Sequence, residues 1–144
     1  MWIFFAIGAS ILWGLVYTVN EKIYNYIRVT PYLAISFLVA GVIMSAISIY
    51  SGEFFKDLSA IFTTQKLFWL VASGILFLIL AEICIGFSIM EKNATIAGLI
   101  EISYPIFIVI FSYLLFKENT LTLGAAIGGA LVFIGIGVIY LFSK

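Results

Sequence analysis

Two glutamates stand within long apolar runs of the sequence, Glu82 in LFLILAEICIGF and Glu101 in IAGLIEISYPIF. A carboxylate in apolar surroundings can take up and release a proton, or it can pair with a cationic ligand. Either chemistry requires elements that hold the side chain away from bulk water and beside a cavity. The first question is therefore which elements carry Glu82 and Glu101.

Other chemistries lack their parts. The chain has no histidine and one cysteine, Cys84, which lies in an apolar run. Metal sites of cysteine and histidine, Cys-His or Ser-His catalysis and a disulfide framework are therefore not expected. We expect no enzyme, no cofactor and no metal. Seven Lys and Arg balance seven Asp and Glu, so no basic surface for nucleic acid is expected either.

The composition places the chain in a lipid bilayer. Of 144 residues, 65% are hydrophobic and only 10% are charged, which is far outside the range of soluble domains. A transmembrane helix needs about 20 mostly apolar residues, and this template fits five times, over residues 2–22, 31–51, 67–90, 94–116 and 121–142. We expect an all-α integral membrane protein whose residues 1–144 form one five-helix domain, with the termini on opposite sides. The first segment lacks a basic n-region and is expected to be a retained span.

The polar breaks between the spans are short, except for residues 51–66, SGEFFKDLSAIFTTQK. We expect a plain connector there, and the alternative is a short amphipathic turn along the membrane interface. Basic residues divide almost evenly between the two sides, so the positive-inside signal is weak. Two membrane topologies therefore remain possible. The chain inserts in a single, weakly specified orientation, or copies insert in both orientations and pair as inverted repeats do.

Both glutamates are expected at one depth. Glu82 lies 10 residues before Lys92 and Glu101 lies 9 after it. At about 1.5 Å per residue, both side chains lie about 14–15 Å below the surface at Lys92, near the midplane of a core about 30 Å thick. A charge there costs about 2.5–3.5 kcal/mol, and such residues usually face a cavity. We expect at least one of the two to be protonated at neutral pH.

Three stretches of the sequence resemble a known family: ILWGLVYTVNEK, YPIFIVIFSYLLFKE and the glycine-rich run LTLGAAIGGALVFIGIGVIYLF. They resemble one half of an EamA-type protein of the drug/metabolite transporter (DMT) superfamily, related to the small multidrug resistance transporters. Lys117 and Glu118 stand where such proteins place a short Gly-Glu turn. The small multidrug group carries an essential glutamate in helix one, where this chain has Leu12, Trp13 and Gly14, so that role does not transfer.

The resemblance implies one five-helix repeat that works by alternating access as a dimer. The partner would be a second copy, in an antiparallel homodimer, or a second half-size protein in a heterodimer. The implied location is the plasma membrane of a prokaryote. Three glycines fall on one face of residues 121–142 and are expected to pack against another helix or a second copy: Gly124, Gly128 and Gly135.

The candidate site for a small-molecule substrate and a proton combines the two glutamates with residues on neighbouring turns and on the first helix: Glu101, Glu82, Gly98, Tyr104, Trp13 and Tyr17. The alternative is a permanently protonated glutamate that hydrogen-bonds a nearby hydroxyl, such as Ser10, Ser103 or Tyr104.

The leading hypothesis is proton-coupled export of a metabolite, amine or drug-like compound. The alternatives are a non-transporting membrane subunit and a lipid-carrier flippase component of a larger complex. An intramembrane enzyme ranks third, because the sequence offers no set of nucleophile and base without histidine.

Overall fold

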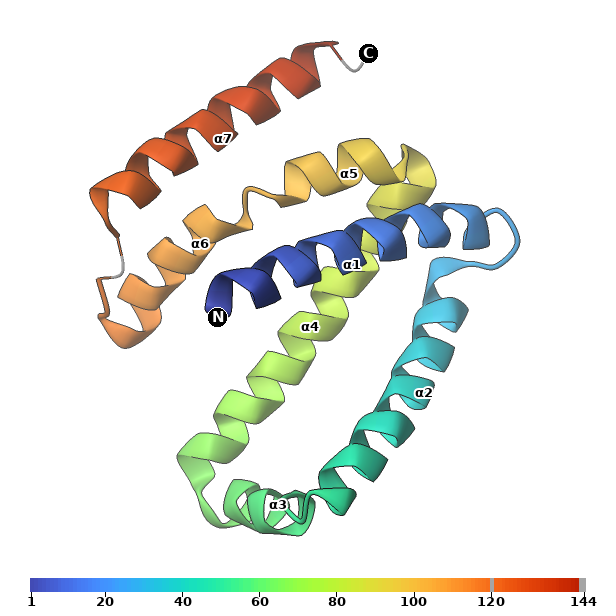
Figure 1. Cartoon of the computed structure of the whole chain (residues 1–144), viewed down its shortest axis with the longest axis vertical. Helices are drawn as coiled ribbons and strands as arrows, with labels where there is room; N and C mark the ends of the chain where they lie inside the picture. The colour runs from blue at the N-terminus through green and yellow to red at the C-terminus, as the bar shows by residue number, and fades with distance from the viewer. Residues whose placement is uncertain (120, 143–144) are drawn as a thin grey trace. The chain divides into compact units, whose positions relative to one another are not determined.

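The computed structural model describes residues 1–119 and 121–142, and every regular element in these ranges is a helix. Figure 1 shows the elements in chain order: α1 (Trp2–Ile23), α2 (Val29–Tyr50), α3 (Phe54–Thr63), α4 (Gln65–Glu91), α5 (Ala94–Glu101), α6 (Tyr104–Phe111), the π-helical turn η1 (Ser112–Phe116) and α7 (Leu123–Phe142). Five stretches are long and apolar enough to cross a membrane, namely α1, α2, α4, residues 94–116 and α7. The predicted all-α fold with five spans is confirmed.

The fourth span differs from the continuous helix that we expected over residues 94–116. Helix α5 ends at Glu101, two residues turn, and α6 begins at Tyr104. Pro105 has no N–H and its ring clashes with the carbonyl of the residue four positions earlier, which is Glu101. The chain turns more tightly instead, with hydrogen bonds from Ser103 N to Ile100 O (3.2 Å) and from Ile106 N to Ser103 O (3.1 Å). Proline therefore breaks this span directly after the carboxylate.

The same span ends in an unusual turn. After η1, Lys117 takes the left-handed conformation with φ of 59°, which glycine normally occupies at helix ends. Its backbone N–H donates to Tyr113 O at 3.0 Å, and its ammonium lies 5.5 Å from the centre of the Tyr113 ring. A cation–π contact of this kind offsets part of the cost of the backbone conformation.

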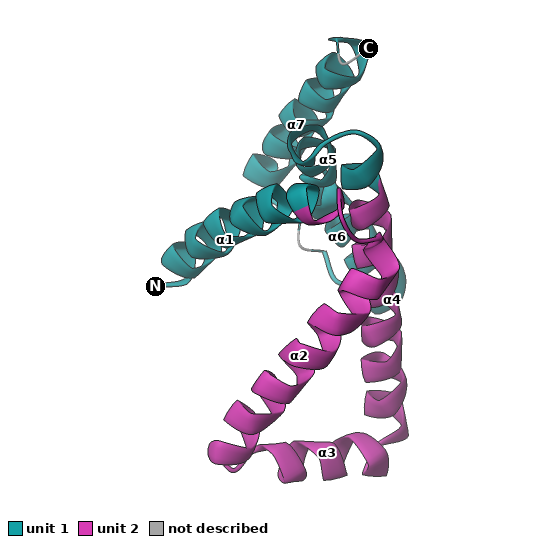
Figure 2. Cartoon of the chain, turned by 90° about the vertical axis from the view of Figure 1, so that its right-hand side faces the viewer, with its two compact units in different colours: residues 1–22, 88–144 teal, residues 23–87 magenta. Residues whose placement is uncertain are grey.

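The segment between the second and third spans is helical, so the prediction of a plain connector was wrong. Residues Phe54–Thr63 form α3, which runs from the end of α2 to the start of α4 (Figure 2). Phe54, Phe55, Leu58, Ile61 and Phe62 recur at the spacing of a helical face, and this period favours a helix over a loop.

The chain divides into two compact units (Figure 2), one of residues 1–22 and 88–144 and the other of residues 23–87. The first unit holds α5, α6, α7 and almost all of α1, and the second holds α2, α3 and most of α4. The expectation of one five-helix domain stays a prediction.

In the second unit, a close approach between helices depends on Gly86 of α4. A Cβ at this position would stand 2.5 Å from Val29 Cγ1 and 3.0 Å from the Tyr24 hydroxyl. Val29 is 1% exposed, and the Tyr24 ring packs edge-on against Tyr32 with centroids 5.7 Å apart. Glycine is thus required where the start of α2 meets α4, because any larger residue would push these side chains apart.

Candidate functional site

The candidate site in the first unit centres on a hydrogen bond between α1 and α5. The Tyr17 hydroxyl donates to Glu101 Oε2 at 2.5 Å. This length lies at the short end of the range for O–H···O hydrogen bonds. Two residues that the sequence analysis placed in one site are therefore in direct contact.

Gly98 makes this contact possible. A Cβ at position 98 would stand 3.3 Å from Tyr17 Cδ2, so the tyrosine ring lies across the glycine, one turn before the carboxylate that it reaches. The Trp13 ring packs against the same tyrosine, with ring centroids 5.5 Å apart and planes inclined at 51°. Four of the six predicted site residues thus gather on α1 and α5.

A second contact fixes how α1 lies against α5. Glu21 Oε2 accepts a hydrogen bond of 2.7 Å from Ala94 N, at the first residue of α5. Asn93 Oδ1 accepts from Ile96 N at 2.8 Å, which caps the same helix end. Glu21 follows Tyr17 by four residues and Ala94 precedes Gly98 by four. The Glu21 contact and the Tyr17 contact are therefore one helical turn apart on both α1 and α5, and the two helices run antiparallel.

The sequence analysis missed Glu21, which it counted only among the acidic residues. Its other oxygen, Oε1, accepts from Lys22 Nζ at 3.0 Å. The signal that could have found it is a carboxylate within the last turn of one span, where it can reach the free N–H groups at the start of another.

The hydroxyl that hydrogen-bonds Glu101 is not one of those named for the alternative of a permanently protonated glutamate. Ser10, Ser103 and Tyr104 were the candidates, and the donor is Tyr17. Tyr104 lies beyond the helix break and its side chain is 56% exposed, so its place in the site stays a prediction.

Glu82 belongs to the second unit and Glu101 to the first, so a pocket shared by the two glutamates also stays a prediction. Within its own unit, Glu82 acts on Tyr24. Burial raises the pKa of the Tyr24 phenol above its ordinary value of 10.0, and the charges of Tyr32 and Glu82 raise it further. The sequence analysis did not foresee the interaction between Tyr24 and Glu82.

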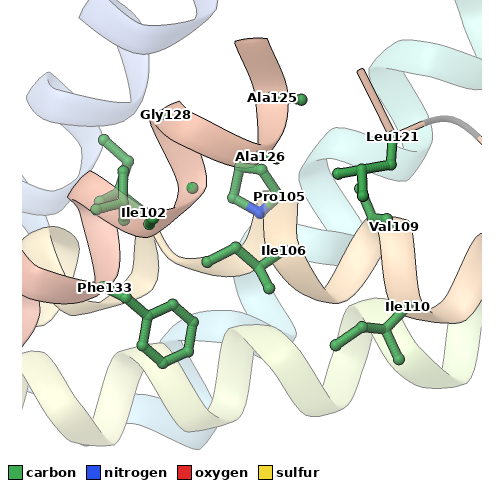
Figure 3. Close-up of a pocket in the computed structure, with 13 residues that line it drawn as sticks. Ile102, Pro105, Ile106, Val109, Ile110, Leu121, Ala125, Ala126, Gly128 and Phe133 are labelled. Carbon is green, nitrogen blue, oxygen red and sulfur yellow. The ribbon is translucent and has the colours of Figure 1, made fainter. Parts of the chain in front are cut away.

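An apolar groove of about 670 Å³ lies between α6 and α7 (Figure 3). Its walls come from Ile102, Pro105, Ile106, Val109, Ile110, Leu121, Ala125, Ala126, Gly128, Gly129, Ala130, Val132 and Phe133. The close approach of the two helices uses Gly129, where a Cβ would stand 3.3 Å from Ile106 Cγ1.

Of the three glycines predicted to pack, Gly128 also lines this groove, whereas Gly124 and Gly135 do not. Among the described residues, no heavy atom comes within 4 Å of a Cβ added at Gly124, Gly128 or Gly135, apart from the near parts of α7 itself. This face is open within the chain, and its role in a dimer stays a prediction.

The sequence matches the family model of the EamA-like transporter family over residues 1–141. The chain belongs to the EamA-like transporter family. It is therefore an integral membrane protein of a family of membrane transporters within the DMT superfamily, which is not a family of enzymes. No curated protein and no solved structure matches it significantly.

Membership in the EamA-like family agrees with the chemistry of the site. In the part of the chain that the structure describes, no group of three or more His, Cys, Asp or Glu residues could hold a metal ion. The arrangement around Glu101 offers a carboxylate, a phenol and an aromatic wall beside a broken helix, which can hold a proton or a cationic group.

Proposed function

We propose that this EamA-like protein is a proton-coupled exporter of a small metabolite, amine or drug-like compound, with Glu101 as the group for which proton and substrate compete. The observation that carries the proposal is the 2.5 Å hydrogen bond from Tyr17 to Glu101, directly before a break in a membrane span. Ionisable residues inside spans commonly mark proton and substrate paths. Irregular backbone at membrane depth is tolerated where it is buried in protein or lines a cavity.

The pair can exchange partners without a change in the backbone. Ionised Glu101 accepts the bond from Tyr17, whereas protonated Glu101 carries its own O–H, which can donate to the Tyr17 oxygen. A substrate ammonium would replace Tyr17 as the donor to the carboxylate. Because the carboxylate holds either a proton or a cation, binding of one favours release of the other, and alternating exposure of the site then couples the two fluxes.

We further propose that the transporter is a dimer, either of two antiparallel copies or with a second half-size protein. The support is that the chain carries five spans, whereas alternating access in many transporters uses two related repeats. The glycine face of Gly124, Gly128 and Gly135 is open to a partner. The location that we propose is the plasma membrane of a prokaryote.

A second candidate function rests on the groove between α6 and α7. Its lining side chains are all apolar, which suits a hydrocarbon chain and favours a lipid-carrier flippase or a component of one. In that case the substrate is a lipid carrier, whose hydrocarbon chain the groove would hold.

The experiment that tests the proposal is proton flux in liposomes that contain the purified protein, with a panel of amines, amino acids, cations and a lipid carrier. Glu101→Gln keeps the size of the side chain and removes its charge, and Tyr17→Phe keeps the ring over Gly98 and removes its hydroxyl. Glu53→Gln, at the start of α3, is the matched control for loss of a glutamate charge.

We expect substrate-driven proton movement by the native protein, its abolition by Glu101→Gln, partial loss with Tyr17→Phe and no change with Glu53→Gln. Movement of the lipid carrier alone would favour the flippase. If the native protein moved no compound and Glu101→Gln lost only assembly, a non-transporting subunit would replace the proposed transporter.

A further inference from the structure

Helix α3 separates its apolar and polar residues onto opposite faces. With 3.6 residues per turn, its large apolar side chains fall within an arc of about 120°: Phe54, Phe55, Leu58, Ile61 and Phe62. Lys56, Ser59 and Thr63 lie outside this arc, with Lys56 and Thr63 on the opposite side. A stripe of this width is what a helix needs to bury one side in an apolar phase and keep the other in water.

Most of the apolar face is not covered by the protein. Phe55 is 69% exposed, Leu58 38% and Phe62 70%. Phe62 contacts the start of α4 through the Phe68 ring, with centroids 6.2 Å apart. Something other than this chain must therefore shield these three large apolar side chains from water.

The position of α3 in the second unit identifies that cover. The helix crosses from the end of α2 to the start of α4 (Figure 2), and both α2 and α4 are long and apolar enough to be membrane spans. Their ends next to α3 carry Tyr50, which is 96% exposed, and Trp69, which is 64% exposed. Tyrosine and tryptophan are enriched where spans pass through the headgroup layer, so α3 lies at that level.

We propose that α3 is a membrane-surface helix that lies in the plane of the interface, with Phe55, Leu58 and Phe62 inserted at the boundary of headgroups and acyl chains. Such helices insert by about 5–10 Å. The partner of this surface is the lipid bilayer in which the spans stand. The inference does not depend on the transport activity proposed above.

Charge around α3 indicates how it binds. The two acidic residues Glu53 and Asp57 balance the two basic residues Lys56 and Lys66. A helix without net positive charge gains little from anionic lipid. Attachment therefore rests on the inserted apolar side chains, and it is insensitive to salt and to the content of anionic lipid.

The test uses nitroxide labels on the full chain in phosphatidylcholine liposomes. Cys84 is the only cysteine, so Cys84→Ala gives a background in which single cysteines are placed at Phe55 and Phe62 on the apolar face and at Lys56 and Ser59 outside it. Collision rates of each label with oxygen, which partitions into lipid, and with a water-soluble nickel complex are then measured by electron paramagnetic resonance.

We expect a ratio of oxygen to nickel collisions that is severalfold higher at positions 55 and 62 than at 56 and 59, unchanged by salt or by added anionic lipid. Equal ratios on both faces would place α3 in water and overturn the proposal. Protection of positions 55 and 62 from both reagents would also overturn it, because protein would then cover the face. A ratio that rises only with anionic lipid would contradict apolar insertion.

A matched pair of charge substitutions keeps the proposal testable in variants that fold. In the Phe62→Cys background, Leu58→Lys places a charge within the apolar face, and the neighbouring Ser59→Lys places the same charge outside it. We expect Leu58→Lys to lower the oxygen-to-nickel ratio severalfold and Ser59→Lys to leave it unchanged. Equal effects of the two lysines would contradict insertion of this face.

Discussion

Pro105 stands four residues after Glu101, and helix α5 ends at Glu101. The backbone carbonyl of Glu101 is the acceptor that an unbroken helix would pair with residue 105, and proline cannot donate to it. The helix therefore ends at the residue that carries the carboxylate. The Tyr17 hydroxyl of α1 reaches the Glu101 side chain at the residue where the helix ends.

Pro105→Ala should restore the missing donor and join α5 to α6. Proline in a helix interior is less favourable than alanine by about 3 kcal/mol, so we expect a variant that is up to about this much more stable and impaired in transport. Hydrogen exchange of the amides of residues 102–106 is the measurement. Unchanged exchange would mean that the break has a cause other than the proline.

Gly98 should tolerate little added volume. Gly98→Val would displace the Tyr17 ring, because even a Cβ stands 3.3 Å from it, and we expect proton-coupled flux to fall at least as far as with Tyr17→Phe. Gly74→Ala is the control, since its Cβ meets nothing within 4 Å among the described residues. That change should leave flux unaltered and stabilise the helix by up to about 1 kcal/mol. Normal flux in Gly98→Val would remove Tyr17 from the mechanism.

Glu21 should position α1 through its acceptor rather than its charge. Glu21→Gln keeps an oxygen that can accept from Ala94 N–H, the partner of the 2.7 Å bond, whereas Glu21→Ala removes it. We expect Glu21→Ala to lower the thermal midpoint and the proton-coupled flux, and Glu21→Gln to retain most of both. Equal loss in the two variants would show that the charge, and not the hydrogen bond, is what matters.

Gly86→Ala should destabilise the second unit. The added Cβ would stand 2.5 Å from Val29 Cγ1, and the β-branched valine has little freedom to turn away. Overpacking of this kind typically costs about 1–3 kcal/mol. Unfolding in a denaturing detergent measures the change, and Gly41→Ala in α2, with open space at its Cβ, should show no comparable loss.

Tyr24 should make the protein sensitive to alkali. Its pKa is raised above 10.0 in the folded chain by burial and then by the charges of Tyr32 and Glu82. The folded state therefore holds the proton more tightly than the unfolded state, and this contribution to stability is fully present below a pH of about 10 and is lost as the pH rises through the raised pKa.

The Tyr24→Phe variant tests this dependence. We expect the native protein to lose stability more steeply above that pH than Tyr24→Phe does, as followed by thermal unfolding at increasing pH. The exposed Tyr50, replaced by Phe, is the control and should behave as the native protein. Identical alkaline profiles for the native chain and Tyr24→Phe would contradict the raised pKa.

The sequence by itself determined the spans, because a run of about 20 apolar residues is stable in lipid only as a membrane-spanning helix. The predicted boundaries lie within two residues of α1, α2, α4, residues 94–116 and α7. It also made Glu101 a candidate site residue, because a carboxylate in such a run is costly wherever it points. Pro105 is also visible in the sequence, yet whether a proline kinks a span or ends it depends on tertiary contacts that a sequence does not contain.

Only the tertiary structure decided which residue hydrogen-bonds Glu101. Tyr17 and Glu101 are separated by 84 positions, and no local period links them. The pairing follows from the register of α1 against α5, which the contact between Glu21 and Ala94 N–H helps to set. Side-chain hydrogen bonds between distant helices depend on this register to within one turn, whereas apolar length does not. The elements could therefore be predicted from the sequence, but the donor that meets Glu101 could not.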